Sequence, residues 1–276
     1  MEPVRPEFVP EAGLSREAME TQQQEIAAAA EFADRLSFDP AAVSLDQTDR
    51  SQSTLSDTHS PPDTSTQSDT ENPDHPIIAG VDQAFLDDRA ISAIVAIQDG
   101  EIIERTHAVV DLSIPYIPGL LAFREGEAIV EAFNTLDCEP DIALFDGSGR
   151  IHYRQAGLAT HMGVVFDLPA IGVAKSLLCG EPRESVEGQP EGWRTPIEAT
   201  SRVDCPAGTT IGYAYQSRQY DSPNRSINPL YVSPGHRVSA ETAVDLVAAV
   251  GGGYKLPEPT RLADQYVDDC KRRLGS

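Results

Sequence analysis

The strongest chemical signal in this sequence is a carboxylate at the end of a short apolar segment. Residues 142–145 are apolar without polar alternation, are too few for a helix, and are followed by Asp146 and a Gly-x-Gly turn. This pattern predicts a buried strand that ends at Asp146. A charged group beside such a core costs several kcal/mol unless it is paired or bound to a metal. His152, further along the chain, could supply a neutral ligand, a hydrogen-bond donor or a proton carrier at the same edge.

Two further carboxylates have comparable surroundings. Asp82 ends a second apolar segment, and Glu125 lies in the first turn of a predicted helix. Carboxylates that converge can share Mg²⁺, which prefers one or two of them together with waters and phosphate oxygens. Taken singly, such residues are more often turn, cap or first-turn helix residues. The metal hypothesis therefore depends on a fold that brings them together.

The elements around these residues predict a mixed α/β domain. Three antiparallel strands come first, with Asp99-Gly100 as the hairpin signal between the second and the third. Helices and strands then alternate, which is typical of a parallel α/β unit. The expected strands cover residues 77–82, 90–97, 101–110, 142–146, 170–174, 210–215 and 230–233. The expected helices cover 121–136, 158–166, a segment from a cap at Ser239 through residue 250, and a segment that follows Pro257-Glu258-Pro259 and runs through residue 273.

The first part of the chain differs in composition from the rest. Residues 1–45 form an N-terminal helical segment, with one helix expected over 15–36 from a cap at Ser15. Residues 46–75 are rich in Ser, Thr, Asp and Pro, which predicts a disordered acidic linker or insertion. The domain of interest is then expected over 76–276.

Composition restricts the classes of function. The formal net charge is −23, and only three lysines accompany 18 arginines, which favours an intracellular protein of a salt-loving microbe. A net-acidic protein binds nucleic acid poorly through its overall field, so such a partner would need a local arginine-lined groove. The four cysteines form no Cys-x-x-Cys pair, which argues against a zinc site and a disulfide framework. No secretory signal or membrane-spanning run is evident, so we expect a cytoplasmic monomer that does not bind membranes.

The predicted order of elements resembles the core of ribonuclease H-like nucleases. In that layout three antiparallel strands precede parallel α/β units, and the first and fourth strands lie side by side. Asp82 and Asp146 end those two strands here. They would then meet at one edge of the sheet and could share a divalent cation.

Five motifs carry a more specific resemblance. They are Ile114-Pro115-Tyr116-Ile117-Pro118-Gly119, Phe123-Arg124-Glu125, Phe145-Asp146-Gly147, Gly172-Val173-Ala174-Lys175 with Leu178-Cys179-Gly180, and the segment 232–239 from Val232 to Ser239. In order and spacing, over about residues 77 to 250, they resemble endonuclease V. The resemblance implies a magnesium-dependent endonuclease, with Mn²⁺ as an alternative ion, that acts on hypoxanthine in DNA or inosine in RNA. Such enzymes nick the strand one nucleotide beyond the lesion on its 3′ side and leave the base in place.

The resemblance also implies roles for single residues. Asp82 and Asp146 would bind the metal directly, and Glu125 would bind it directly or through one of its ligands. His152 would lie beside the cleaved phosphate or the metal-bound waters, and Lys175 would neutralise that phosphate. His236 matches another family position near the site, with a less clear role.

Two further groups of residues match family positions that handle the base. The strand-separating wedge would be Pro115, Tyr116, Ile117 and Pro118. Two prolines fix φ around an aromatic and an apolar residue, so these can be presented rigidly and can replace lost base stacking. The pocket for the flipped base would be lined by Leu121, Gly147, Gly149, Gly157 and Leu178, with backbone amides at the glycines reading its edge.

Two departures from the family pattern concern the same region. Ser148 stands where the family commonly has histidine, and Gln155-Ala156 replaces an Arg-Leu pair. They affect the expected affinity and substrate preference more than the chemistry. Two alternatives remain open, namely a structure-specific nuclease of the same fold that cuts flaps or junctions, and a catalytically silent nucleic-acid-binding module.

Overall fold

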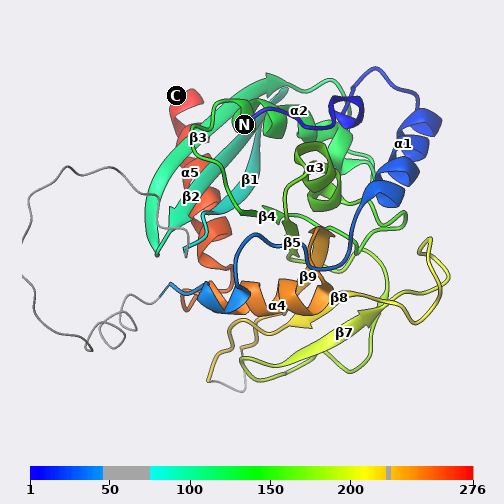
Figure 1. Ribbon diagram of the computed structural model, residues 1–276, viewed down its shortest axis with the longest axis vertical. Coiled ribbons are helices and arrows are strands. Elements are labelled where there is room, and N and C mark those ends of the chain that lie inside the picture. The colour runs from blue at the N-terminus through cyan, green and yellow to red at the C-terminus, as the bar shows by residue number, and fades with distance from the viewer. Residues whose placement is uncertain (46–74, 222–224, 276) are drawn as a thin grey trace, which may run out of the picture.

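The computed structural model describes residues 1–45, 75–221 and 225–275, which form a mixed sheet with helices on both faces (Figure 1). The strands are β1 Ile78–Leu86, β2 Arg89–Gln98, β3 Glu101–Asp111, β4 Ile142–Asp146, β5 Ala170–Ala174, β6 Glu181–Pro182, β7 Arg194–Glu198, β8 Thr210–Tyr215 and β9 Leu230–His236. The helices are η1 Pro6–Phe8, α1 Arg16–Ala29, η2 Pro40–Ala42, α2 Leu121–Asn134, α3 Leu158–Phe166, α4 Ala240–Ala249 and α5 Glu258–Leu274.

The strand order places the two predicted carboxylate strands beside each other. The order is β3-β2-β1-β4-β5-β9-β8-β7-β6, so that β1 lies between β2 and β4. The pairs β1–β4 and β4–β5 are parallel, and all other pairs are antiparallel. This confirms the predicted mixed sheet, with three antiparallel strands followed by parallel ones.

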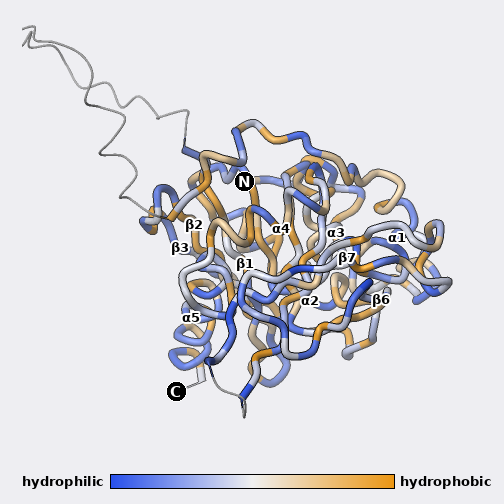
Figure 2. The backbone as a smooth tube through the Cα atoms, turned by 90° about the horizontal axis from the view of Figure 1, so that it is seen from below, coloured by the Kyte–Doolittle hydropathy of each residue, from blue (hydrophilic) through white to orange (hydrophobic). Residues whose placement is uncertain are grey.

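Side chains alternate between the two faces of the sheet along the central strands, and this alternation determines which of them pack against which helix. Val81 and Phe145 pack with α2 and α3 in one apolar cluster, whereas Ile142 and Leu144 pack with α4 in another. Successive side chains of a strand point to opposite faces, so both faces of β4 are apolar and buried. Figure 2 shows the hydrophobic stretches concentrated in the central strands. Each large side chain buried here contributes roughly 1.5–3 kcal/mol.

Helix α5 lies against β1 and β2 on the same face of the sheet as α4. It comes so close that a Cβ at Gly80 would lie 2.0 Å from the carbonyl oxygen of Pro259. Only a residue without a side chain permits this approach. Residues two apart on a strand share a face, so Asp82 points to the same side as Gly80, toward α5.

The N-terminal segment packs onto this body. Helix α1 begins after Ser15, whose side chain accepts a hydrogen bond from the Ala18 amide as predicted, but it ends at Ala29 rather than near residue 36. Its Met19 packs with Ile114, Leu120 and Phe123, and its Ile26 packs with Ala156 and Val164. The segment is therefore a neighbour of the region predicted to bind substrate.

The predicted elements agree with the structure in the core and differ toward the edges. The ranges of α3 and β5 are as expected, and Asp99 and Gly100 both have positive φ, as a tight hairpin turn requires. The first strand runs past Asp82 to Leu86, because it continues as a hairpin with β2. Strands β6 and β7 were not predicted, since Pro196 interrupts the strand pattern of β7. Most of the predicted linker lies outside the described residues. Within those residues, no helix is both long and apolar enough to cross a membrane.

Candidate active site

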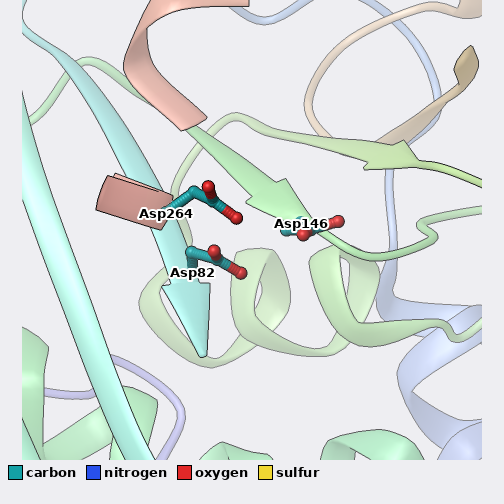
Figure 3. Close-up of side chains that lie close together, drawn as sticks. All are labelled: Asp82, Asp146 and Asp264. Carbon is teal, nitrogen blue, oxygen red and sulfur yellow. The ribbon is translucent and has the colours of Figure 1, made fainter. Parts of the chain in front are cut away.

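The predicted convergence of Asp82 and Asp146 is present, and a third aspartate joins them. One carboxylate oxygen from each of Asp82, Asp146 and Asp264 lies within 4.8 Å of the others. Figure 3 shows the three side chains approaching one another from β1, the end of β4 and α5. We refer to these three residues as the acidic cluster.

Strand register explains how the acidic cluster forms. Strands β1 and β4 pair in parallel up to Val81 and Phe145, so the next residues of both strands are the two aspartates. Beyond that point β1 pairs only with β2, and the side of Asp82 toward β4 is left open. Asp146 belongs to the same face as Ile142 and Leu144, and therefore also points toward the side where α5 lies.

Asp264 was not predicted as a site residue. It lies on α5 beside the buried stripe formed by Thr260, Ala263 and Val267. A charged residue at the edge of an otherwise buried helical stripe is a signal that the sequence did contain. What the sequence did not show is that this stripe lies against β1, because that contact joins distant parts of the chain.

The acidic cluster is electrostatically unfavourable without a cation. Asp82 is 6% exposed, and burial together with the negative charge of Asp146 raises its pKa to about 8. Its Oδ1 accepts a hydrogen bond from the backbone amide of Gln83, at 2.8 Å. Buried carboxylates without sufficient donors favour the protonated form or a bound metal ion.

Lys175, at the end of β5, supplies positive charge to this region. Its Nζ lies 2.7 Å from Oδ2 of Asp146 and 3.8 Å from Oδ1 of Asp264. Burial alone would lower the pKa of Lys175, but the hydrogen bond and charge of Asp146 outweigh it, and the pKa is raised. Lys175 therefore stays charged at the rim of the acidic cluster.

Glu125 faces the same pocket without belonging to the group of three. Asp82, Asp146, Lys175 and Glu125 all line a cavity of about 320 Å³, which we call the metal pocket. Glu125 is 5% exposed, and burial raises its pKa to about 8, although the Arg124 guanidinium opposes the shift. In the metal-free protein it is therefore a buried proton-carrying group beside the acidic cluster.

A second cavity adjoins the metal pocket. It measures about 90 Å³ and shares Leu121, Ser148 and Leu178 with the metal pocket, so the two cavities have a common wall. We call it the base pocket, after the role predicted for its lining. Its remaining lining residues are Gln23, Tyr116, Gly119, Ala122, His152, Ala156, Gly157 and Leu158.

The predicted wedge lies at the edge of the base pocket. Tyr116 is 66% exposed and also lines the pocket, so its ring is available to solvent. Ile117 was predicted to be exposed beside it, but it is half-buried and packs with Leu120 and Phe123. The wedge therefore presents one aromatic ring, supported from below by an apolar cluster.

Comparisons with known proteins agree with this geometry. The family model described as Endonuclease V matches residues 63–265. An Endonuclease V from Haloarcula marismortui is 60% identical over 273 residues, which cover 98% of this chain and 97% of the relative. The chain belongs to the Endonuclease V family. It is therefore an endonuclease, and the interpretation as a catalytically silent binding module is not retained.

Solved structures of Endonuclease V share the fold. The catalytic domain of human Endonuclease V superposes with a TM-score of 0.70 at 29% identity, covering 95% of this chain and 99% of that one. An Endonuclease V from Ciona intestinalis, solved with a 24mer DNA containing an inosine followed by a ribo-adenosine, has a TM-score of 0.66 at 22% identity. It covers 94% of this chain and 98% of its own, and at this identity it supports the fold alone.

The glycines matched to the Endonuclease V base pocket are close-packed, and their amides are already used. Gly147, Gly149 and Gly157 donate their amide hydrogens to Val173 O, Ser233 Oγ and Gly149 O, respectively. A Cβ at Gly157 would lie 2.3 Å from the carbonyl oxygen of Ser148. Gly157 lines the base pocket and Gly147 the metal pocket, whereas within the described residues Gly149 lines neither. These glycines permit close packing of the wall. Their amides were expected to be free to bind the base, but all three donate to groups within the protein.

His152 lies in the base pocket rather than at the acidic cluster. It is 3% exposed, its Nε2 lies 3.0 Å from Gly119 O, and its Nδ1 accepts from the Arg154 amide at 3.2 Å. These partners place the ring hydrogen on Nε2. Burial lowers the pKa of His152 to about 4, so the ring is neutral near neutral pH. With both nitrogens engaged, His152 positions Gly119 in this structure, and it is not free to carry a proton.

His236 is not brought to the acidic cluster. It pairs in register with Ala170 at the amino end of β5, whereas Lys175 follows the carboxyl end of the same strand. Its Nδ1 accepts from the Glu31 amide at 3.2 Å, and its Nε2 lies 3.2 Å from Oδ1 of Asp167. His236 is fully buried, and burial lowers its pKa. The antiparallel direction of β9 therefore separates this motif residue from the site, and its contacts there are structural.

Proposed function

We propose that this endonuclease hydrolyses DNA at deaminated adenine, needs Mg²⁺, and cuts one nucleotide beyond the lesion on its 3′ side. The observation that supports this most directly is the shared wall of the two pockets. A base held in the base pocket would leave a neighbouring phosphate beside the acidic cluster. The cut would then fall at the second phosphodiester on the 3′ side of the lesion nucleotide, and its base would stay in place.

The side chains of the acidic cluster fit a hard divalent cation. Asp82, Asp146 and Asp264 offer oxygen ligands from three elements within 4.8 Å of one another, and the raised pKa of Asp82 reflects its burial and the nearby charge of Asp146. Mg²⁺ accepts such a set together with waters and a substrate phosphate, and Mn²⁺ is an alternative. When bound, the ion supplies Lewis-acid activation of the phosphate and of a water nucleophile.

The remaining residues of the metal pocket have separate tasks in the proposed reaction. Lys175 can turn its ammonium from Asp146 to the scissile phosphate, where it offsets negative charge that develops in the transition state. Glu125 can hold a water or a ligand of the metal through its buried carboxyl group. The apolar residues Leu121 and Leu178 of the shared wall keep bulk water from the region between the two pockets.

Recognition of the lesion is proposed for the base pocket and the wedge. The exposed ring of Tyr116 can stack in place of a base that has left the helix. Ser148 places a half-buried hydroxyl in the wall shared by the two pockets, whereas His152 and the three glycine amides are engaged within the protein. The inosine-containing DNA bound by the Ciona intestinalis relative is consistent with this substrate class.

The test compares four end-labelled substrates in molar KCl, with Mg²⁺ or with EDTA. They are a matched duplex, the same duplex with one deoxyinosine, a flap without inosine, and an RNA strand with one inosine. We expect nicking of the inosine strands with Mg²⁺ only, mapped to the second phosphodiester on the 3′ side of the lesion nucleotide. Asp146→Ala should abolish the nicking, and Asp88→Ala, at an exposed turn, should not. Preferential cutting of the flap would instead support a structure-specific nuclease.

A further inference from the structure

Gln23 is a buried polar residue of α1 that lines the base pocket. Its side chain is 1% exposed, although most glutamines of that helix face solvent or are half-buried. Gln23 lies outside residues 63–265, which the family model matches, and no motif in the sequence pointed to it. A buried amide on an otherwise peripheral helix requires an account of its partners.

Every polar atom of the Gln23 amide is used. Its Nε2 donates to Gly119 O at 2.8 Å and, more weakly, to Ala156 O at 3.4 Å. Its Oε1 accepts from Nη1 of Arg154 at 3.1 Å. Oε1 of Glu20, one turn earlier on α1, lies 2.8 Å from Nη2 of Arg154, so that Gln23 and Glu20 both bind this guanidinium. One face of α1 thus contacts Gly119 and Ala156, which line the base pocket, and Arg154 beside them.

The contact with Gly119 reaches the wedge directly. Gly119 follows Pro118, the last residue of the wedge, and has a φ of +82°. Its carbonyl oxygen receives Nε2 of Gln23 and Nε2 of His152, so both of its lone pairs are engaged. The direction of this one peptide group therefore fixes where the wedge leaves the pocket wall.

We propose that Gln23 is a positioning residue for lesion recognition, which holds the end of the wedge against the floor of the base pocket. The inference rests on the proposed function, because it assigns Gln23 to the pocket that would receive the deaminated base. Gln23 touches neither the acidic cluster nor its pocket. It acts through Gly119 and Arg154, and its loss should affect binding of the lesion while the chemistry of a bound strand proceeds.

The test uses the full chain and the substitution Gln23→Met, which keeps the volume and removes the amide. We expect KM for the deoxyinosine strand to rise roughly tenfold, the usual effect of losing one net hydrogen bond, with kcat within about twofold of wild type. Affinity for the matched, undamaged duplex should stay unchanged, measured with Ca²⁺ in place of Mg²⁺. The control is Gln24→Met, the same change at the neighbouring exposed position of α1.

A second variant separates the donor role of Gln23 from its contact with Arg154. Gln23→Glu keeps an acceptor for Arg154 but offers no donor to Gly119, and it should raise KM as much as Gln23→Met. Melting temperatures show whether each variant is folded. An unchanged KM in either folded variant, or an equal loss on lesion and matched strands, would overturn the inference. A wild type without inosine preference would overturn the proposed function and this inference together, whereas full preference retained by Gln23→Met would overturn the inference alone.

Discussion

The substitution Asp82→Asn separates the function of the acidic cluster from its cost in stability. Asp82 is 6% exposed and shares its surroundings with the carboxylates of Asp146 and Asp264. Its pKa rises from the ordinary value of 3.8 to about 8, first because of burial and then because of Asp146. Between these values the folded state binds this proton more tightly than the unfolded chain, so the stability that protonated Asp82 contributes is lost as pH rises from about 4 to 8.

The size of the effect follows from that difference in pKa. Folding near pH 7 requires an ionised Asp82 to take up a proton. Because pH 7 lies about three units above the ordinary pKa of this carboxyl group, the uptake costs about 4 kcal/mol. Asparagine avoids this cost, and its side-chain oxygen can still accept from the Gln83 amide. Its own buried NH₂ group offsets part of the gain. We expect a net stabilisation of about 2 kcal/mol, or roughly 4–8 °C in melting temperature for a protein of this size.

The assay is thermal unfolding in molar KCl, with EDTA or with Mg²⁺, from pH 5 to pH 8. In EDTA the Asp82→Asn protein should melt above wild type, and the difference should grow with pH. With Mg²⁺ only the wild type should gain stability, and only the wild type should nick substrate. Asp88→Asn removes the same charge at an exposed turn and should leave the melting temperature nearly unchanged. An Asp82→Asn protein that melts at or below wild type in EDTA would refute the reasoning.

Four other outcomes are expected. Asp264→Ala should lower Mg²⁺-dependent nicking by more than about a hundredfold, since it removes a metal ligand, whereas Asp268→Ala, at an exposed position of α5, should not. Tyr116→Ala should weaken binding of inosine DNA by roughly tenfold or more while slowing cleavage of bound strand far less, and equal losses in both would contradict the wedge role. Burial lowers the pKa values of His152 and His161 to about 4, below the unfolded value of 6.5. The contribution of each histidine to stability should therefore fall as pH drops from about 6.5 to 4, by up to about 3 kcal/mol. His161→Gln should make the melting temperature less dependent on pH in this range. The net charge of −23 should make the melting temperature rise steeply with KCl up to the molar range, and a flat dependence would contradict the predicted adaptation to salt.

The sequence predicted those parts of the site that depend on local patterns. An apolar run that stops at Asp146 identifies a buried strand and its end, and the order of elements then brings β1 beside β4. Asp264 could not be predicted in this way, because its approach to Asp82 depends on how α5 packs across β1. His236 shows the converse, since a motif places it near the site while the antiparallel β9 carries it to the other end of β5.

In the base pocket, too, the sequence predicted some of the lining residues but not their hydrogen bonds. The motif residues Leu121 and Leu178 line it, and the wedge residue Tyr116 lies at its edge, but the hydrogen bonds of its polar atoms depend on contacts that no motif describes. Gln23 and His152 both donate to Gly119 O, and this arrangement depends on α1 folding back over the loop that follows the wedge. Spacing along the chain can indicate which residues line a cavity. It cannot indicate which of their donors are already used, and that decides what a ligand can be offered.

The geometry of β1 explains why the site is both exposed to substrate and costly to fold. If β1 ended at Asp82, the carboxylate would lie in a solvated turn and would ionise freely. Instead β1 continues to Leu86 with β2 alone, which keeps Asp82 on a rigid strand while the side toward β4 opens into the metal pocket. A rigid, poorly solvated carboxylate is preorganised for a cation, and for the same reason it is destabilising when the cation is absent. Metal affinity and the instability of the metal-free protein therefore have one structural origin. A variant that removes the instability should also lose the affinity for the metal.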